Sequence, residues 1–314
     1  MAKMEGVAVA PAEHVAAPWL VSDTPAAIVR RRPGGLARFV RSSPLGTVAA
    51  IFLLFVFAMA LLADVVTYWD PLVTNYGLTR AAPSGDHLLG TDHLGRDILS
   101  RIVTGARISL FVALIAVLVG DGVGLAWGIV SGYFGGRVDL LSQRVLDALL
   151  SFPGLILAML LLVALGAGLS TVIIAIAVTR IPLSTRVIRS VALTTKSLAY
   201  VEAARTLGAS PLRILVQHVA PQCIAPFLVI VSANIGVAIT TEAGLSFLGI
   251  GVPPPTPTWG NMLGGVLAES FRPPWWLIVY PGVALTSTVL AANLFGDALR
   301  DFLDPRLRGK LTDL

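Results

Sequence analysis

The sequence predicts an all-α, polytopic membrane protein with six transmembrane helices. Only 13% of its 314 residues are charged and the mean hydropathy is +0.82, whereas about a quarter of an ordinary soluble domain is charged. Several apolar runs are long enough to cross about 30 Å of hydrocarbon, which takes roughly 20 helical residues. The net charge of +5 comes from arginines scattered between these runs. They form no basic stripe, which argues against a nucleic-acid partner.

The expected spans follow from long runs with few or no charges. The first extends from Ser42 to Ala63 without a charge, and the second is interrupted only by Asp121. The charge-free stretch 148–179 is too long for one span, and GAGLS at 166–170 offers a turn, so it should belong to two helices. We therefore expect transmembrane helices over 42–63, 108–136, about 146–166, about 169–188, about 223–247 and 276–299.

The distribution of lysine and arginine predicts that both termini face the cytoplasm. Positive residues concentrate in the N-terminal tail, around Arg137 and Arg144, in the loop 186–213 and in the C-terminal tail, and the intervening loops hold fewer. A cleaved signal peptide is the alternative for the first span, but its apolar core is too long for one. The expected organisation is a cytoplasmic tail (1–41), a first transmembrane helix (42–69), an extracytoplasmic loop (70–104), a five-helix core (105–300) with a cytoplasmic hairpin (197–221), and a cytoplasmic tail (301–314).

The stretch YVEAARTLGASPLRILVQHVAP, residues 200–221, predicts two short helices set at an angle. Residues 198–207 favour a helix, and Gly208 can adopt the left-handed conformation that ends it. Ser210 can accept a hydrogen bond from a free backbone amide, and Pro211 suits the first position of a second helix. The hairpin carries charges that are too polar for the bilayer, so it should protrude into the cytoplasm and suit contact with a soluble partner. A plain interfacial loop is the alternative.

This stretch resembles the EAA loop of the inner-membrane subunits of ABC importers. The shared pattern is EAARTLG with a proline thirteen residues after the glycine; in the family, aliphatic residues usually precede that proline, whereas this chain has His218 nearby. The resemblance implies that the hairpin docks into a cleft of an ATPase. It also implies the residues that couple the two proteins: Glu202, Ala203, Ala204, Gly208, Ser210, Pro211 and Pro221.

Five further motifs resemble the dipeptide/oligopeptide/nickel permease family, and the first of them resembles its C-type subunit. Together they are distributed across residues 87–309. The resemblance implies a type I ABC importer (MetI-like) transmembrane fold in a bacterial inner membrane and short peptides as substrates, with nickel or another small solute as the alternative. The motifs are GTDHLGRD (90–97), GYFGGRVD (132–139), QRVLDALLSFPGLILA (143–158), LSFLGIGVPPPTPTWGNML (245–263) and GDALRDFLDPRLRG (296–309).

The same resemblance implies the partners and the source of energy. The partners are a homologous B-type permease, one or two ABC ATPase subunits, an extracytoplasmic solute-binding protein and the lipid bilayer. The sequence contains no GxxxxGK[ST], HExxH or GxSxG pattern. We therefore expect no catalysis and no cofactor in this chain, with ATP and Mg²⁺ bound by the ATPase subunits. An ion-coupled secondary carrier is the alternative, although the sequence shows no convincing internal repeat.

The expected spans contain a row of small residues and several polar ones. Glycines recur every fourth residue from Gly120 to Gly132, which places them on one helical face for close packing against a helix of this chain or of a sister subunit. Asp121 and Arg180 are candidates for an ion pair across helices, since charges inside a bilayer are costly. Polar residues of the fifth span either line the translocation pathway or bond neighbouring helices: Ser232, Asn234, Thr240, Thr241 and Glu242.

Two outer segments have their own chemistry. The prolines of GVPPPTPTWG fix φ and remove amide donors, so this loop should be stiff and suit docking of a binding protein, or serve as a simple rigid turn. In GTDHLGRD the opposite charges of Asp92, Arg96 and Asp97 favour an internal ion pair. A metal site from His87, Asp92 and His93 is a remote alternative, and we expect no metal site.

Overall fold

The computed structural model describes residues 39–40, 42–269 and 272–303, and the regular elements of this part of the chain are helices. Most of the predicted tails 1–41 and 301–314 lies outside the described residues, and the last helix continues to Leu303, three residues into the predicted C-terminal tail. Five helical stretches are long and apolar enough to cross a membrane, or six if one bent pair of helices counts as a span. They are α2 (Pro44–Leu61), α4 (Ile98–Phe134), α7 (Leu169–Lys196), the continuous stretch Pro211–Phe247, and α12 (Trp276–Leu303).

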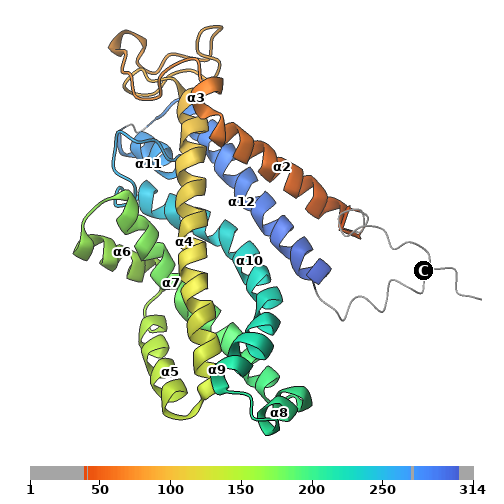
Figure 1. Ribbon diagram of the computed structural model, residues 1–314. Helices are drawn as coiled ribbons and strands as arrows, with labels where there is room; N and C mark the ends of the chain where they lie inside the picture. Colours follow the sequence, from red (N-terminus) through yellow and green to blue (C-terminus); the bar gives the residue numbers. More distant parts are fainter. Residues whose placement is uncertain (1–38, 41, 270–271, 304–314) are drawn as a thin grey trace, which may run out of the picture.

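The helices form an elongated bundle around α4, with α2 and α12 side by side along one flank (Figure 1). A short helix α3 (Ala63–Val66) and the loop that contains the 3-10 turn Tyr76–Leu78 lie at one end of α4. The short helices α8 (Ala199–Thr206) and α9 (Pro211–Ile214) lie at the opposite end. The loop that follows the first span and the hairpin 197–221 are therefore at opposite ends of the bundle, as the predicted topology requires.

The expected single helix over 146–166 is wrong. The chain forms two helices instead, α5 (Gly136–Leu150) and α6 (Gly154–Leu165), which meet at 88°. Pro153 lies at the break with an extended ψ of 132°. Proline lacks an amide hydrogen for the helix and disfavours a helical conformation in the residue before it, so it favours a break at this point. Two ion pairs hold α5 against α7. Asp139 pairs with Arg189, and Asp147 pairs with Arg186 at an N–O distance of 2.5 Å.

Helix α4 begins ten residues before the expected start of the second span. The Asp97 carboxylate caps it by accepting a hydrogen bond from the Ser100 amide at 2.8 Å. The added first turns carry Arg101 and Arg107, which hydropathy places outside a span. Both arginines are used locally: Arg101 donates to the Pro71 carbonyl at 3.0 Å, and Arg107 forms a two-pronged contact with Asp64 at 3.0 Å.

The row of glycines on α4 packs against α7 of the same chain, as expected for contact within the chain. A Cβ built on Gly120 would lie 2.5 Å from the Ala177 carbonyl oxygen, and one on Gly124 would lie 2.6 Å from the Ser184 Cβ. Gly128 and Gly132 meet the same helix one and two turns further along. Because no side chain separates the helices, their backbones approach closely and α4 and α7 form one packed pair.

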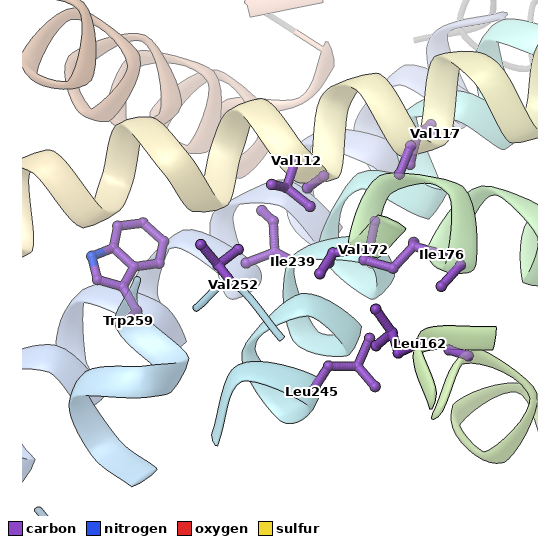
Figure 2. Packing of buried hydrophobic residues seen from close by; sticks show 14 of the residues in the cluster. Val112, Val117, Leu162, Val172, Ile176, Ile239, Leu245, Val252 and Trp259 are labelled. Atoms are coloured by element: carbon purple, nitrogen blue, oxygen red, sulfur yellow. The ribbon is translucent and has the colours of Figure 1, made fainter. Parts of the chain in front are cut away.

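The main hydrophobic core lies where α4, α6, α7 and α10 (Ala220–Phe247) converge (Figure 2). Val112 and Val117 of α4 face Val172 and Ile176 of α7, and these four side chains are fully buried. Trp259, at the start of α11 (Trp259–Glu269), closes the outer side of this core and donates its ring N–H to the Ile102 carbonyl at 3.1 Å. Below it, the hairpin 197–221 is attached to the bundle by a separate buried cluster.

Candidate coupling hairpin and polar sites

The turn of the hairpin has the geometry predicted from Gly208. Leu207 is the C-cap residue of α8, and Gly208 follows with φ +83°. The Gly208 amide donates to the Arg205 carbonyl at 3.0 Å and the Ala209 amide donates to the Ala204 carbonyl at 3.1 Å. This pair of bonds is the Schellman motif, which satisfies carbonyls left free at a helix end.

The second arm begins as predicted but does not end where expected. Ser210 caps α9 by accepting a hydrogen bond from the Arg213 amide at 3.4 Å, and Pro211 occupies the first turn. A π-helical segment, Leu215–Val219, then leads without interruption into α10. The expected start of the fifth span at residue 223 is therefore wrong, because the arm and the span are one helix. Pi-helical turns are rare, and they occur often at functional sites.

Most of the implied coupling residues lie on the surface of the hairpin. Of the set, Ala204 is half-buried, and the others are exposed: Glu202, Ala203, Gly208, Ser210, Pro211 and Pro221. The inner face of the hairpin is apolar, with Val201, Ile214 and Val219 buried against the inner ends of α4 and α7. The hairpin is thus a fixed projection with an open outer surface.

The Asp121 carboxylate lies fully buried in the middle of the bundle, where three helices meet. Its oxygens accept hydrogen bonds from the Asn234 side-chain amide of α10 at 3.0 and 2.9 Å and from the Ser184 hydroxyl of α7. Arg180 is near enough to interact with this charge but forms no ion pair with it among the described residues. The suggested pair of Asp121 and Arg180 is therefore replaced by hydrogen bonds to neutral groups.

Glu242 is also fully buried, near the outer end of α10. Its Oε1 atom accepts a hydrogen bond from the Ser246 hydroxyl at 2.7 Å, one turn along the same helix. Ser246 in turn accepts from the Val252 amide at 3.3 Å, which holds the loop after α10 against the helix end. The Glu242 side chain is thus enclosed by protein groups, and a position at the depth of the lipid headgroups stays a prediction.

The structure does not gather the five candidate pathway residues on one surface. Asn234 and Glu242 point into separate polar clusters, and Ser232 is buried with its hydroxyl on the Val229 carbonyl. Thr240 is exposed and Thr241 half-buried, and each bonds the carbonyl four residues earlier in α10. Two of the five thus bond their surroundings inside the bundle. A role in the pathway stays a prediction for all five.

The loop 67–97 is folded by its own polar contacts. Arg96 pairs with Asp92 at 2.7 Å, as expected, and Arg101 approaches the same carboxylate at 3.5 Å. His87 pairs with Asp97 at 3.0 Å. Within the ranges that the structure describes, no group of three or more His, Cys, Asp or Glu residues is arranged to hold a metal ion.

Sequence reasoning missed several residues that fasten the helices. Arg107 joins α4 to the end of the first span, and the pair Asp139 and Arg189 joins α5 to α7. Ser184 of α7 completes the site around Asp121. The charged residues carry a visible signal, since an arginine or aspartate at a span border needs a partner. Ser184 carries none, because a serine within a helix is ordinary.

The chain is similar to inner-membrane components of transport systems. The family described as "Binding-protein-dependent transport system inner membrane component" matches residues 124–309. A protein of Brucella suis biovar 1, provisionally named as a peptide transport system permease, is 42% identical over 261 residues, covering 83% of this chain and 88% of the relative. The glutathione transport system permease protein GsiD of Pectobacterium atrosepticum is 40% identical over 272 residues, covering 86% and 90%. The protein of that name in Escherichia coli O1:K1 is 40% identical over 278 residues, covering 87% and 90%.

A solved structure with a similar fold is the methionine ABC transporter MetNI in an inward-facing conformation. It superposes with a TM-score of 0.55 at 18% identity, covering 66% of this chain and 98% of the other. At this identity the likeness concerns the fold alone. It agrees with the MetI-like transmembrane fold expected from the sequence.

Proposed function

This chain belongs to the family of binding-protein-dependent transport system inner membrane components, and from that premise we propose that it is a permease subunit of an ATP-driven importer of short peptides. It crosses the membrane several times and contributes part of the translocation pathway. The chain itself performs no catalysis and holds no cofactor. Energy comes from ATP and Mg²⁺ bound by separate ATPase subunits.

The names of the relatives favour peptides over nickel as the substrate class. One relative is provisionally named for peptide transport, and two others are named for glutathione, which is itself a tripeptide. Relatives at about 40% identity over nearly their whole length support a shared substrate class. Nickel remains the alternative implied by the wider family.

The observation that carries the coupling proposal is the attachment of the hairpin. Its outer surface is open, its inner surface is packed on α4 and α7, and its second arm continues into α10 as one helix of 37 residues. A protein that binds the hairpin therefore also acts on a membrane-spanning helix. We assign this binding to an ABC ATPase, which contacts Glu202, Ala203 and Gly208 at the exposed surface.

The remaining partners follow from the two ends of the bundle (Figure 1). The hairpin end faces the cytoplasm with both termini, and the end with the loop 67–97 faces an extracytoplasmic solute-binding protein. A homologous B-type permease completes the pathway, and one or two ATPase gene products serve the two permeases. Closure of the ATPases on ATP moves the hairpins and alternates access between the two sides.

Reconstituted uptake tests this function. Vesicles receive the chain with its sister permease, its ATPase subunits and the binding protein, and uptake of a radiolabelled dipeptide or of ⁶³Ni²⁺ is followed with and without ATP. We expect dipeptide uptake that requires ATP and every added subunit. Uptake driven by an ion gradient through this chain alone would support a secondary carrier and refute the proposal, and ATP-dependent uptake of nickel but not dipeptide would refute the peptide assignment.

A further inference from the structure

The Glu242 carboxyl is enclosed on all sides and has only one completed hydrogen bond. Its relative exposure is 0%. Oε1 accepts from Ser246 at 2.7 Å, but Oε2 has no hydrogen-bond partner among the described residues. Buried polar atoms in folded proteins nearly always have a partner, so this oxygen requires an explanation.

The groups around this carboxyl are neutral hydroxyls. The hydroxyls of Ser109 in α4 and of Thr258, just before α11, are close enough to influence the carboxyl, but neither makes a hydrogen bond to Oε2. The Ser109 hydroxyl is itself fully buried and without a partner in the described part of the chain. No described lysine, arginine or histidine forms an ion pair with Glu242. A buried carboxylate without a cation is costly, and such groups usually take up a proton instead.

The segments that surround Glu242 fit closely against the end of α10. A Cβ on Gly260 would lie 2.3 Å from the Ala243 carbonyl oxygen, and one on Gly264 would lie 2.2 Å from that of Phe247. Gly251 meets Ser246 at the same short range. The loop after α10 and helix α11 therefore pack directly against the outer end of α10, close to Glu242.

We propose that Glu242 is a neutral carboxylic acid whose Oε2 proton is donated to the Ser109 hydroxyl, so that it fastens the outer end of α10 to α4 and to the loop before α11. A hydrogen bond between Oε2 and the Ser109 hydroxyl gives a partner to both unpaired atoms, and the proton on Oε2 removes the buried charge that no cation balances. Oε1 keeps its role as acceptor for Ser246. Glu242 is thus a positioning residue that does not need to touch the substrate.

This role deepens the proposed function and rests on it. The helix that contains Glu242 begins at the hairpin, so the carboxyl fastens the far end of the same helix that the ATPase is proposed to move. Movement of the hairpin then reaches the outer loop only if that fastening is intact. Loss of the fastening should separate ATPase binding, which persists, from uptake, which fails.

Infrared difference spectroscopy tests the protonation state on the full chain in lipid vesicles. The spectrum of wild type minus Glu242→Gln should contain the carbonyl stretch of a protonated carboxylic acid at neutral pH. The control is Asp86→Asn, because Asp86 is exposed in the outer loop and its difference spectrum should contain carboxylate bands instead. A carboxylate signal lost with Glu242→Gln would overturn the proposal.

Uptake by the reconstituted complex tests the positioning role. Glu242→Gln keeps a donor and an acceptor without charge and should retain uptake within about twofold, whereas Glu242→Ala should lose about tenfold or more, as expected when about 1–3 kcal/mol of buried hydrogen bonding is removed. Co-purification of the ATPase should be unchanged in both. Equal loss in both variants would show that a charge is required, and full activity of Glu242→Ala would show that the fastening is dispensable; either result rejects the proposal.

The same measurements separate this inference from the proposed function. If the chain is not an ATP-driven permease, wild-type uptake and ATPase co-purification fail before any variant is compared. Ser109→Ala, which removes only the proposed acceptor, should reduce uptake less than Glu242→Ala. Combining the two changes should add little, because both remove one interaction. Fully additive losses would contradict the pairing of Ser109 with Glu242.

Discussion

Replacing Gly208 with valine should disable the hairpin while leaving the membrane-spanning bundle assembled. Gly208 has φ +83°, and its amide donates one of the two bonds that end α8. A Cβ built at this position would meet no atom within 4 Å. A clash therefore contributes nothing, and the whole effect comes from the backbone conformation.

The size of the effect follows from that conformation. The left-handed region costs a residue with a Cβ about 1–2 kcal/mol, and a β-branched residue is strongly disfavoured there. A penalty of this size lowers the fraction of molecules with an intact turn roughly 5- to 30-fold relative to the distorted form. The turn is part of the proposed contact with the ATPase, so the affinity for the ATPase should fall by a similar factor.

The assay measures ATPase binding to vesicles and ATP-dependent uptake for the same preparations. Gly282→Val serves as the matched control, because Gly282 lies inside α12, has no left-handed φ and would also place a Cβ in open space. We expect Gly208→Val to lose binding and uptake and Gly282→Val to keep both. Normal ATPase binding and uptake by Gly208→Val, with the protein correctly inserted, would refute the assigned role of the turn.

Three further substitutions test how the bundle is held together. Gly124→Val should lower the free energy of unfolding by about 1–3 kcal/mol through overpacking against α7. Gly122→Val on the same helix should not, because a Cβ there meets nothing within 4 Å. Equal thermal stability of the two variants in detergent would contradict the close packing of α4 on α7. Asp121→Ala should also destabilise the bundle by about 1–3 kcal/mol, because it leaves a buried amide and a buried hydroxyl without their acceptor, and thermal unfolding that matches wild type would show that this site is not needed. Reversing the charge at Asp139 or Arg189 alone should expose α5 to proteolysis, and exchanging the two residues should restore protection; absence of rescue would show that the ion pair does not hold α5 in place.

Hydropathy predicts the first membrane-spanning helix well, and it fails where charges are locally paired. The run 42–63 contains α2 as a helix of 18 residues. The first turns of α4 were missed because Arg101 and Arg107 lower the local hydropathy, although both are held by groups from the preceding segment. A hydropathy average takes no account of such a partner, so it predicts a later start for α4 than the structure has.

The bend between α5 and α6 has a visible signal in the sequence. Pro153 stands in the middle of the expected helix and disfavours a continuous helix there, whereas the need for about 20 residues to cross the hydrocarbon favours one. Local chemistry predicted the hairpin turn better, because glycine, serine and proline act on their immediate neighbours. The pairing of Asp121 with Asn234 could not be predicted, since the two residues are 113 positions apart and meet only through the packing of α4 on α10.

The unbroken helix from Pro211 to Phe247 has a mechanical consequence. Its 37 residues, at about 1.5 Å each, follow a path of roughly 55 Å, nearly twice the thickness of the hydrocarbon layer, and this path curves along its length (Figure 1). If the helix turns by about 10° as one body, a point about 30 Å from the pivot travels roughly 5 Å, about the rise of one helical turn. A small tilt in the membrane is therefore enough to shift about one turn of contacts at the end that lies far from the pivot.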